Sequence, residues 1–75
     1  MNDRVRAKPP TTEVDRWQEG VVRAVRFDDH ERRYTVVVEP SDGDRVGVTV
    51  SESIYDLFTG RIDGDEPVGE TVWFR

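Results

Sequence analysis

Cysteine is absent from this chain of 75 residues, and histidine occurs once, as His30. The missing cysteine excludes disulfides, thiolate nucleophiles and Cys-based zinc sites, and the single histidine excludes a multi-histidine metal site within one chain. Long apolar runs are absent too, because no segment approaches the roughly 20 residues that span a bilayer. The basic start, MNDRVRAKPP, lacks the apolar stretch of a secretory signal. We therefore expect a small cytoplasmic domain without redox chemistry, cofactor or membrane association.

Lysine and the larger aliphatic residues are scarce. Ten of the 11 cations are arginine, and 13 valines stand beside only two isoleucines and one leucine. Against the 11 cations there are 16 carboxylates, which gives a net charge of -5. An acidic surface with little lysine suits a salt-rich cytoplasm, where net charge resists association. We expect a halophilic microbe as the source, and an organism with a GC-rich genome is the alternative.

Positive charge is concentrated at the start of the chain. Residues 1–10 contain three cations and one carboxylate, whereas residues 11–75 contain eight cations and 15 carboxylates. The same stretch contains Pro9 and Pro10, and proline both lacks an N–H donor and restricts the residue before it. The pattern predicts a flexible basic arm over residues 1–13, followed by one domain over residues 14–75.

Four segments are rich in β-branched and aromatic residues, the composition typical of strands. They are residues 17–27, 34–39, 45–51 and 71–75. The third segment has valine at every second position, which indicates a strand with one buried face. The turn pair Asp42-Gly43 precedes it, so residues 34–39 and 45–51 are predicted to form an antiparallel hairpin.

Residues 51–59 (SESIYDLFT) interrupt the alternation and predict a short helix. Ser51 or Ser53 can cap its start, and Ile54, Leu57 and Phe58 have the spacing of one helix face. The chain is therefore predicted to be all-β: a small SH3-like or OB-like barrel of four or five antiparallel strands, with one short helical turn before the last strand. The predicted core consists of Val21, Val25, Phe27, Tyr34, Val36, Val38, Val46, Val48, Val50, Ile54, Leu57, Phe58, Val72 and Phe74.

Three runs of the sequence resemble small uncharacterised proteins of halophilic archaea. They are W-x-E-G-V-V at 17–22, S-I-Y-D-L-F-T-G-R-I at 53–62 and P-V-G-E-T-V-W-F-R at 67–75. The resemblance covers about residues 16–75. It implies a compact β domain and a salt-rich habitat, and it carries no established activity or site to this chain.

Clusters of carboxylates offer metal-binding candidates, but none has the spacing of a known site. Adjacent side chains in the run from Asp28 to Glu31 cannot all point at one ion. The two Asp-Gly-Asp motifs, at 42–44 and 63–65, depart from the EF-hand pattern and are typical of turns. His30 is the only imidazole base and lies in a loop, and no phosphate-binding loop is present. We predict that the chain is not an enzyme and holds no metal.

Binding to another macromolecule is the function class that remains. The proposed binding residues are Tyr55, Trp73, Arg75 and Trp17, with Arg4, Arg6 and Lys8 as contacts from the arm. Aromatic and arginine side chains dominate protein interfaces, so a protein-interaction adaptor or accessory subunit is our first hypothesis. An RNA- or DNA-binding barrel, using the arm and a Trp/Arg surface for stacking, is the alternative. The modest core also suggests a homodimer.

Overall fold

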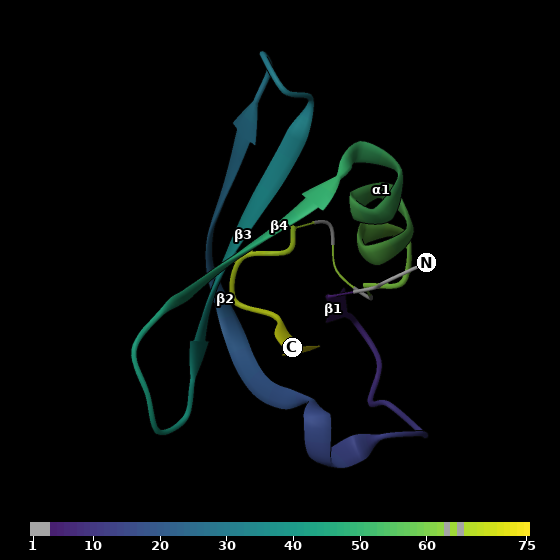
Figure 1. The fold of residues 1–75 in the computed structure, drawn as a ribbon, viewed down its shortest axis with the longest axis vertical. Coiled ribbons are helices and arrows are strands. Elements are labelled where there is room, and N and C mark those ends of the chain that lie inside the picture. The colour runs from purple at the N-terminus through teal and green to yellow at the C-terminus, as the bar shows by residue number, and fades with distance from the viewer. Residues whose placement is uncertain (1–3, 63, 65) are drawn as a thin grey trace.

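Five strands, one α-helix and one short 3-10 helix succeed one another in a computed structural model that describes residues 4–62, 64 and 66–75 (Figure 1). In chain order they are β1 (Val5–Arg6), η1 (Val14–Arg16, 3-10), β2 (Gln18–Asp28), β3 (Arg33–Pro40), β4 (Val46–Ser51), α1 (Glu52–Gly60) and β5 (Thr71–Phe74). The predicted strands and the helix before the last strand are confirmed, and β1 is an addition that the sequence did not suggest.

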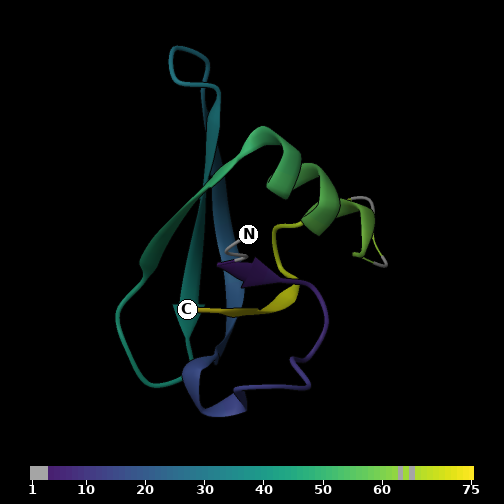
Figure 2. The ribbon, with the colours of Figure 1, turned by 45° about the vertical axis from the view of Figure 1, so that its right-hand side comes forward.

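The strands form one antiparallel sheet with the order β1-β5-β2-β3-β4. In the described part of the chain β1 and β4 are the two edges and do not pair, so the sheet is not a closed barrel. The predicted SH3-like or OB-like barrel is therefore not confirmed. Helix α1 packs over the concave side of the curved sheet (Figure 2), and its Phe58 shares a buried cluster with Val5 of β1. The helix thus covers apolar surface that pairing between the edge strands would cover in a barrel.

The buried core lies between the sheet and α1. It consists of Val5, Val22, Val36, Val38, Val48, Val50, Phe58, Val72 and Phe74. Three residues predicted to be in this core are exposed instead: Phe27 at 42%, Val46 at 39% and Leu57 at 52%. Phe27 lies near the tip of the projecting β2–β3 hairpin, and Val46 begins an edge strand (Figure 1). Both positions lie where less of the protein is available to cover them.

Strand β2 contains a bulge that changes which of its residues face the core. Val22 pairs with Val38, and the register then shifts so that Val25 lies opposite Val36. A bulge places two residues of one strand opposite one of its partner, which reverses the inward parity of the strand beyond it. Val22, before the bulge, is fully buried, and Val25, after it, also packs against the core. The alternation had instead predicted Val21 and Val25 as the inward residues.

Gly20 on the same strand allows a close approach between β2 and β3. A Cβ atom at this position would lie 2.6 Å from Val38 Cγ1 and 2.9 Å from the carbonyl oxygen of Glu39. Both distances are shorter than van der Waals contact, so any side chain here would displace β3. The register shift of β2 lies further along the strand, between Val22 and Ala24.

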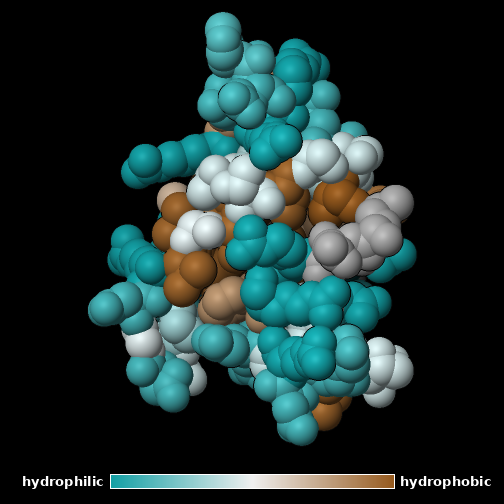
Figure 3. All heavy atoms as spheres, viewed as in Figure 1, coloured by the Kyte–Doolittle hydropathy of each residue, from teal (hydrophilic) through white to brown (hydrophobic). Residues whose placement is uncertain are grey.

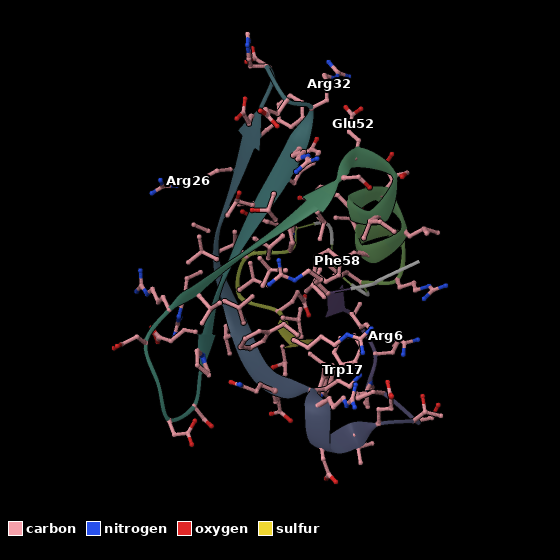
Figure 4. The ribbon with its side chains drawn as sticks, viewed as in Figure 1. Arg6, Trp17, Arg26, Arg32, Glu52 and Phe58 are labelled. Carbon is pink, nitrogen blue, oxygen red and sulfur yellow. The ribbon has the colours of Figure 1, made fainter. Side chains whose placement is uncertain are left out.

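Helix α1 begins where the sequence predicted. The side chain of Ser51 accepts a hydrogen bond from the backbone N–H of Ile54 at 3.4 Å, which satisfies one of the free donors at the helix start. Phe58 then points into the core, as Figure 4 shows, while Leu57 faces away from it. No helix in the described ranges has the length and apolar character needed to cross a membrane.

The segment predicted as a flexible arm includes a strand. Val5 lies opposite Phe74 and Arg6 opposite Trp73 in a short antiparallel ladder, and Val5 is 3% exposed. The sheet also gains a hydrogen bond from the N–H of Arg75 to the carbonyl of Arg4. The arm prediction is thus wrong for Val5 and Arg6. Val5 buries its apolar side chain in the core, although the charged residues around it in the sequence suggested a solvated segment. Residues 1–3 of the arm lie outside the described residues.

Glu39 joins β3 to two arginines. Its carboxylate accepts hydrogen bonds from Arg45 Nε at 3.1 Å and from Arg23 Nη2 at 3.3 Å. The hydrogen bond from Arg45 and the charge of Arg23 lower the pKa of Glu39 below its usual value. This stabilising effect is present above the unfolded-state pKa of about 4.3 and is lost as the pH falls through the lower folded-state pKa.

We expect an NMR titration of the Glu39 carboxyl carbon to show this lowered pKa. In the Arg45→Gln variant the pKa should move back toward the ordinary value, because the strongest stabilising partner of the ionised form is gone. Identical titration midpoints in the two proteins would show that the ion pair is not formed in solution.

Candidate functional site

Two tryptophans and two arginines meet at the edge of the sheet that is formed by β1 and β5. The guanidinium carbon of Arg75 lies 4.8 Å from the centre of the Trp17 ring, and that of Arg6 lies 5.7 Å from it. Figure 4 shows Arg6 and Trp17 close together below α1. Both distances are within the range of cation–π attraction. We call the group formed by Arg6, Trp17, Trp73 and Arg75 the Trp–Arg surface.

Strand pairing explains how these side chains meet. Trp73 is opposite Arg6 on one side of β5 and opposite Glu19 on the other. Directly opposed residues of antiparallel strands project to the same face, and the neighbours of Trp73 on β5, Val72 and Phe74, are buried on the other face. The three opposed side chains therefore share the face that is turned away from the core.

An open pocket of about 350 Å³ lies beside the tryptophans. Its lining consists of Pro9, Pro10, Val14, Trp17, Glu19 and Trp73. Pro9 and Pro10 belong to the segment that follows β1, and Val14 begins the 3-10 turn η1 that leads into β2. Val14 is 55% exposed. The site therefore combines two flat aromatic rings with apolar walls and one carboxylate.

The Trp–Arg surface is locally basic on an acidic protein. The segments that build it, residues 4–19 and 73–75, contain five cations and three carboxylates, whereas the rest of the chain contains six cations and 13 carboxylates. Glu13 contributes ion pairs of 3.5 Å to Arg75 and 3.8 Å to Arg16. Arg6 has its Nε atom buried without a hydrogen-bond partner. The surface thus offers guanidinium groups next to aromatic rings, on segments in which cations outnumber carboxylates.

Tyr55, predicted as a further binding residue, lies elsewhere. Its ring stacks on Tyr34 of β3, with centroids 3.7 Å apart and planes 4° apart, and Tyr34 in turn contacts Phe27. Burial raises the pKa of the Tyr55 hydroxyl above its usual value. The contact fastens α1 to the β2–β3 hairpin, which is also held by an ion pair of 2.8 Å between Arg32 and Glu52 (Figure 4). Tyr55 therefore acts in packing and is separate from the Trp–Arg surface.

Asp28, at the end of β2, stabilises the acidic turn that follows it. The side chain of Asp28 accepts hydrogen bonds from the backbone N–H groups of His30 at 3.0 Å and Glu31 at 3.2 Å. Such bonds stabilise a tight turn and use the carboxylate locally. Across residues 4–62, 64 and 66–75, no group of three or more histidine or carboxylate side chains could hold a metal ion. Asp63 and Asp65, from the second Asp-Gly-Asp motif, lie outside the described residues.

The structure brings together most of the binding residues that the sequence suggested. Trp17, Trp73, Arg75 and Arg6 form one surface, and Arg4 lies beside it, because its Nε donates to the carbonyl of Arg75 at 3.3 Å. Lys8 directly precedes the two prolines that line the pocket. The sequence reading missed Pro9, Pro10, Val14 and Glu19 as pocket residues. The pairing of β1 with β5, which no local pattern encodes, was the missing information.

Comparison with known proteins shows the family without showing a function. The chain matches over residues 1–75 the model of DUF7861, which is described as a family of unknown function. No curated protein and no solved structure gives a significant match. The match includes β1 and the residues between β1 and β2 as well as the rest of the sheet. The chain therefore belongs to the DUF7861 family.

Proposed function

We propose that this protein is a non-enzymatic binding module that recognises another protein through the Trp–Arg surface. The observation that carries the proposal is the gathering of Arg6, Trp17, Trp73 and Arg75 on one surface, where the two tryptophans also line an open pocket of about 350 Å³. Tryptophan and arginine are the residues most enriched among those that dominate binding energy at protein interfaces. Their rings and stems provide apolar contact, and the guanidinium groups provide directional hydrogen bonds.

The charge of the surface specifies the kind of partner segment. Because residues 4–19 and 73–75 carry a local excess of cations on a chain of net charge -5, a partner segment with carboxylates would be attracted here and repelled elsewhere. The apolar pocket beside the arginines would take an apolar or aromatic side chain of the same segment. We therefore propose an acidic segment with at least one large apolar residue as the ligand.

A nucleic acid is the alternative ligand, and two observations weigh against it. Base stacking needs a free aromatic face, whereas guanidinium groups already lie over the Trp17 ring. Phosphate binding needs an extended basic footprint, but the surface is bordered by Glu13 and Glu19, and the rest of the chain is strongly acidic. A short acidic segment needs a smaller basic footprint than a nucleic-acid backbone does, so we prefer a protein ligand.

Replacing Trp73 with alanine is expected to weaken partner binding by about 30-fold or more, which corresponds to the loss of about 2 kcal/mol or more at a central interface residue. The test is affinity capture from an extract of the source cell after nuclease treatment, followed by titration of the captured protein. The matched control is Phe27→Ala, since Phe27 is an exposed aromatic residue at the other end of β2, whereas Trp73 is half-buried beside its start. Equal binding by both variants would contradict the proposal.

Two further variants separate a binding defect from a folding defect and protein from nucleic acid. Arg75→Glu retains both tryptophans and should lower affinity for an acidic segment. Substituting Arg4 and Lys8 with glutamine should reduce the salt dependence of binding if the ligand is a nucleic acid. Deleting residues 1–10 would be a poor test, because it removes the buried Val5. Loss of the captured material on nuclease treatment would favour the nucleic-acid alternative.

A further inference from the structure

Strand β4 is an edge strand without the features that usually protect an edge. It is the last strand of the sheet order, and in the described part of the chain it pairs only with β3. Its sequence, VGVTVS, contains no charged residue and no proline, and Val46 is 39% exposed. Exposed edges normally carry charges, prolines or bulges, because their unpaired N–H and C=O groups can pair with another strand.

The opposite edge of the same sheet is protected. Strand β1 is only two residues long, it includes Arg6, and it is followed by Lys8, Pro9 and Pro10. Short length, positive charge and proline are all devices that prevent pairing at an edge. The contrast between the two edges therefore indicates that β4 is left open for a pairing strand.

Hydrophobic atoms also reach the surface near β4. Figure 3, in the view of Figure 1, shows brown atoms on the side where β4 crosses the sheet, with hydrophilic atoms around them. Val46 is the exposed valine of the strand, whereas Val48 and Val50 are buried. A second strand laid along β4 would cover part of this apolar surface as well as the backbone groups.

Charges at the two ends of β4 specify which strand fits. Before the strand lie Asp42 and Asp44, and beside its last residue, Ser51, lies Arg33 of β3. The other charges next to the strand are engaged within the chain, because Arg45 pairs with Glu39 and Glu52 pairs with Arg32. An antiparallel second copy of β4 would bring the acidic end of each strand to the arginine-bearing end of the other. A parallel copy would place like ends together, which costs energy.

We propose that two copies of this chain associate by antiparallel pairing of their β4 strands about a two-fold axis near Val48 and Thr49, which joins the two sheets into one. The strand is its own complement in length, apolar content and end charges, which is the requirement of an isologous interface. The proposal does not depend on the proposed function, because the Trp–Arg surface is built on β1, β5 and the start of β2, at the other end of the sheet.

The Thr49→Lys variant tests the pairing directly. Thr49 is exposed, and the two-fold axis would place the two lysines close together. Because like charges repel, we expect the dimer dissociation constant of the variant to be at least about tenfold higher than that of the wild type. Sedimentation equilibrium of the full chain over a range of concentrations measures this shift. The control, Thr71→Lys, places the same exposed substitution on β5, which is paired on both sides. Thermal unfolding of both variants shows that they are folded.

A charge exchange tests the orientation. Arg33→Glu should weaken the dimer, and Asp44→Arg in the same chain should restore it, because the exchanged ends are again complementary.

Amide hydrogen exchange should also become slower in β4, and not in β1, as the protein concentration rises. A wild-type protein that stays monomeric would overturn the proposal, as would a Thr49→Lys variant that dimerises as well as Thr71→Lys. Binding of a foreign strand to β4 by a monomer would overturn it too.

Discussion

Replacing Phe58 with alanine is expected to lower the free energy of unfolding by about 3–5 kcal/mol, the usual cost of removing a buried phenylalanine side chain. Phe58 is 3% exposed and is the residue of α1 that is buried in the core with Val5. Its loss would leave a cavity between the helix and the sheet. Since a small domain has a total stability at the low end of about 5–15 kcal/mol, the variant should be largely unfolded at moderate urea concentrations.

Leu57→Ala is the matched control, because Leu57 precedes Phe58 on the same helix and is 52% exposed. We expect a change of less than about 1 kcal/mol for this substitution. Urea denaturation followed by tryptophan fluorescence measures both variants. If the two substitutions had equal effects, the orientation of α1 on the sheet would be wrong.

Replacing Val5 with aspartate is expected to cost about 3–5 kcal/mol, because it leaves a carboxylate without a partner in an apolar environment. Val5 is 3% exposed and is paired with Phe74. The substitution should also weaken partner binding, since β1 carries Arg6 into the Trp–Arg surface. A segment that was merely a flexible arm would accept the aspartate with little change in stability.

Val68→Asp is the control for this prediction. Val68 is 44% exposed in the segment before β5, so the same change of side chain should alter stability by only about 0.5 kcal/mol. Urea titrations of the two variants at neutral pH compare them. Equal stabilities for Val5→Asp and the wild type would show that β1 is not part of the folded sheet in solution.

Local patterns in the sequence predicted the parts of the fold that depend on neighbouring residues. The β3–β4 hairpin follows from alternating valines and the Asp42-Gly43 turn, and the start of α1 follows from Ser51. The inward residues of β2 were partly misassigned, because the bulge between Val22 and Ala24 depends on pairing with β3. The pairing of β1 with β5 joins residues nearly a whole chain apart, and its valine is surrounded in sequence by cations that suggest a solvated tail.

The candidate site was predictable in residue type but not in arrangement. Trp73 has the parity opposite to Val72 and Phe74, which correctly suggested that it leaves the core. Trp17 and Arg6 meet only because two distant strands flank β5. Tyr55 was grouped with them on the basis of the helix pattern, whereas Tyr34, a residue of another element, determines where its ring lies.

Photo-crosslinking from the rim of the pocket tests the central claim most directly. Val14 lines the pocket and is 55% exposed, so a photoreactive amino acid placed there should be tolerated and should lie against any ligand of the Trp–Arg surface. The same amino acid at Phe27 is the control. The account predicts crosslinks from position 14 to a protein, in a segment rich in carboxylates, that survive nuclease and are absent from position 27. Crosslinks to nucleic acid, or crosslinks to a partner from position 27 only, would contradict it.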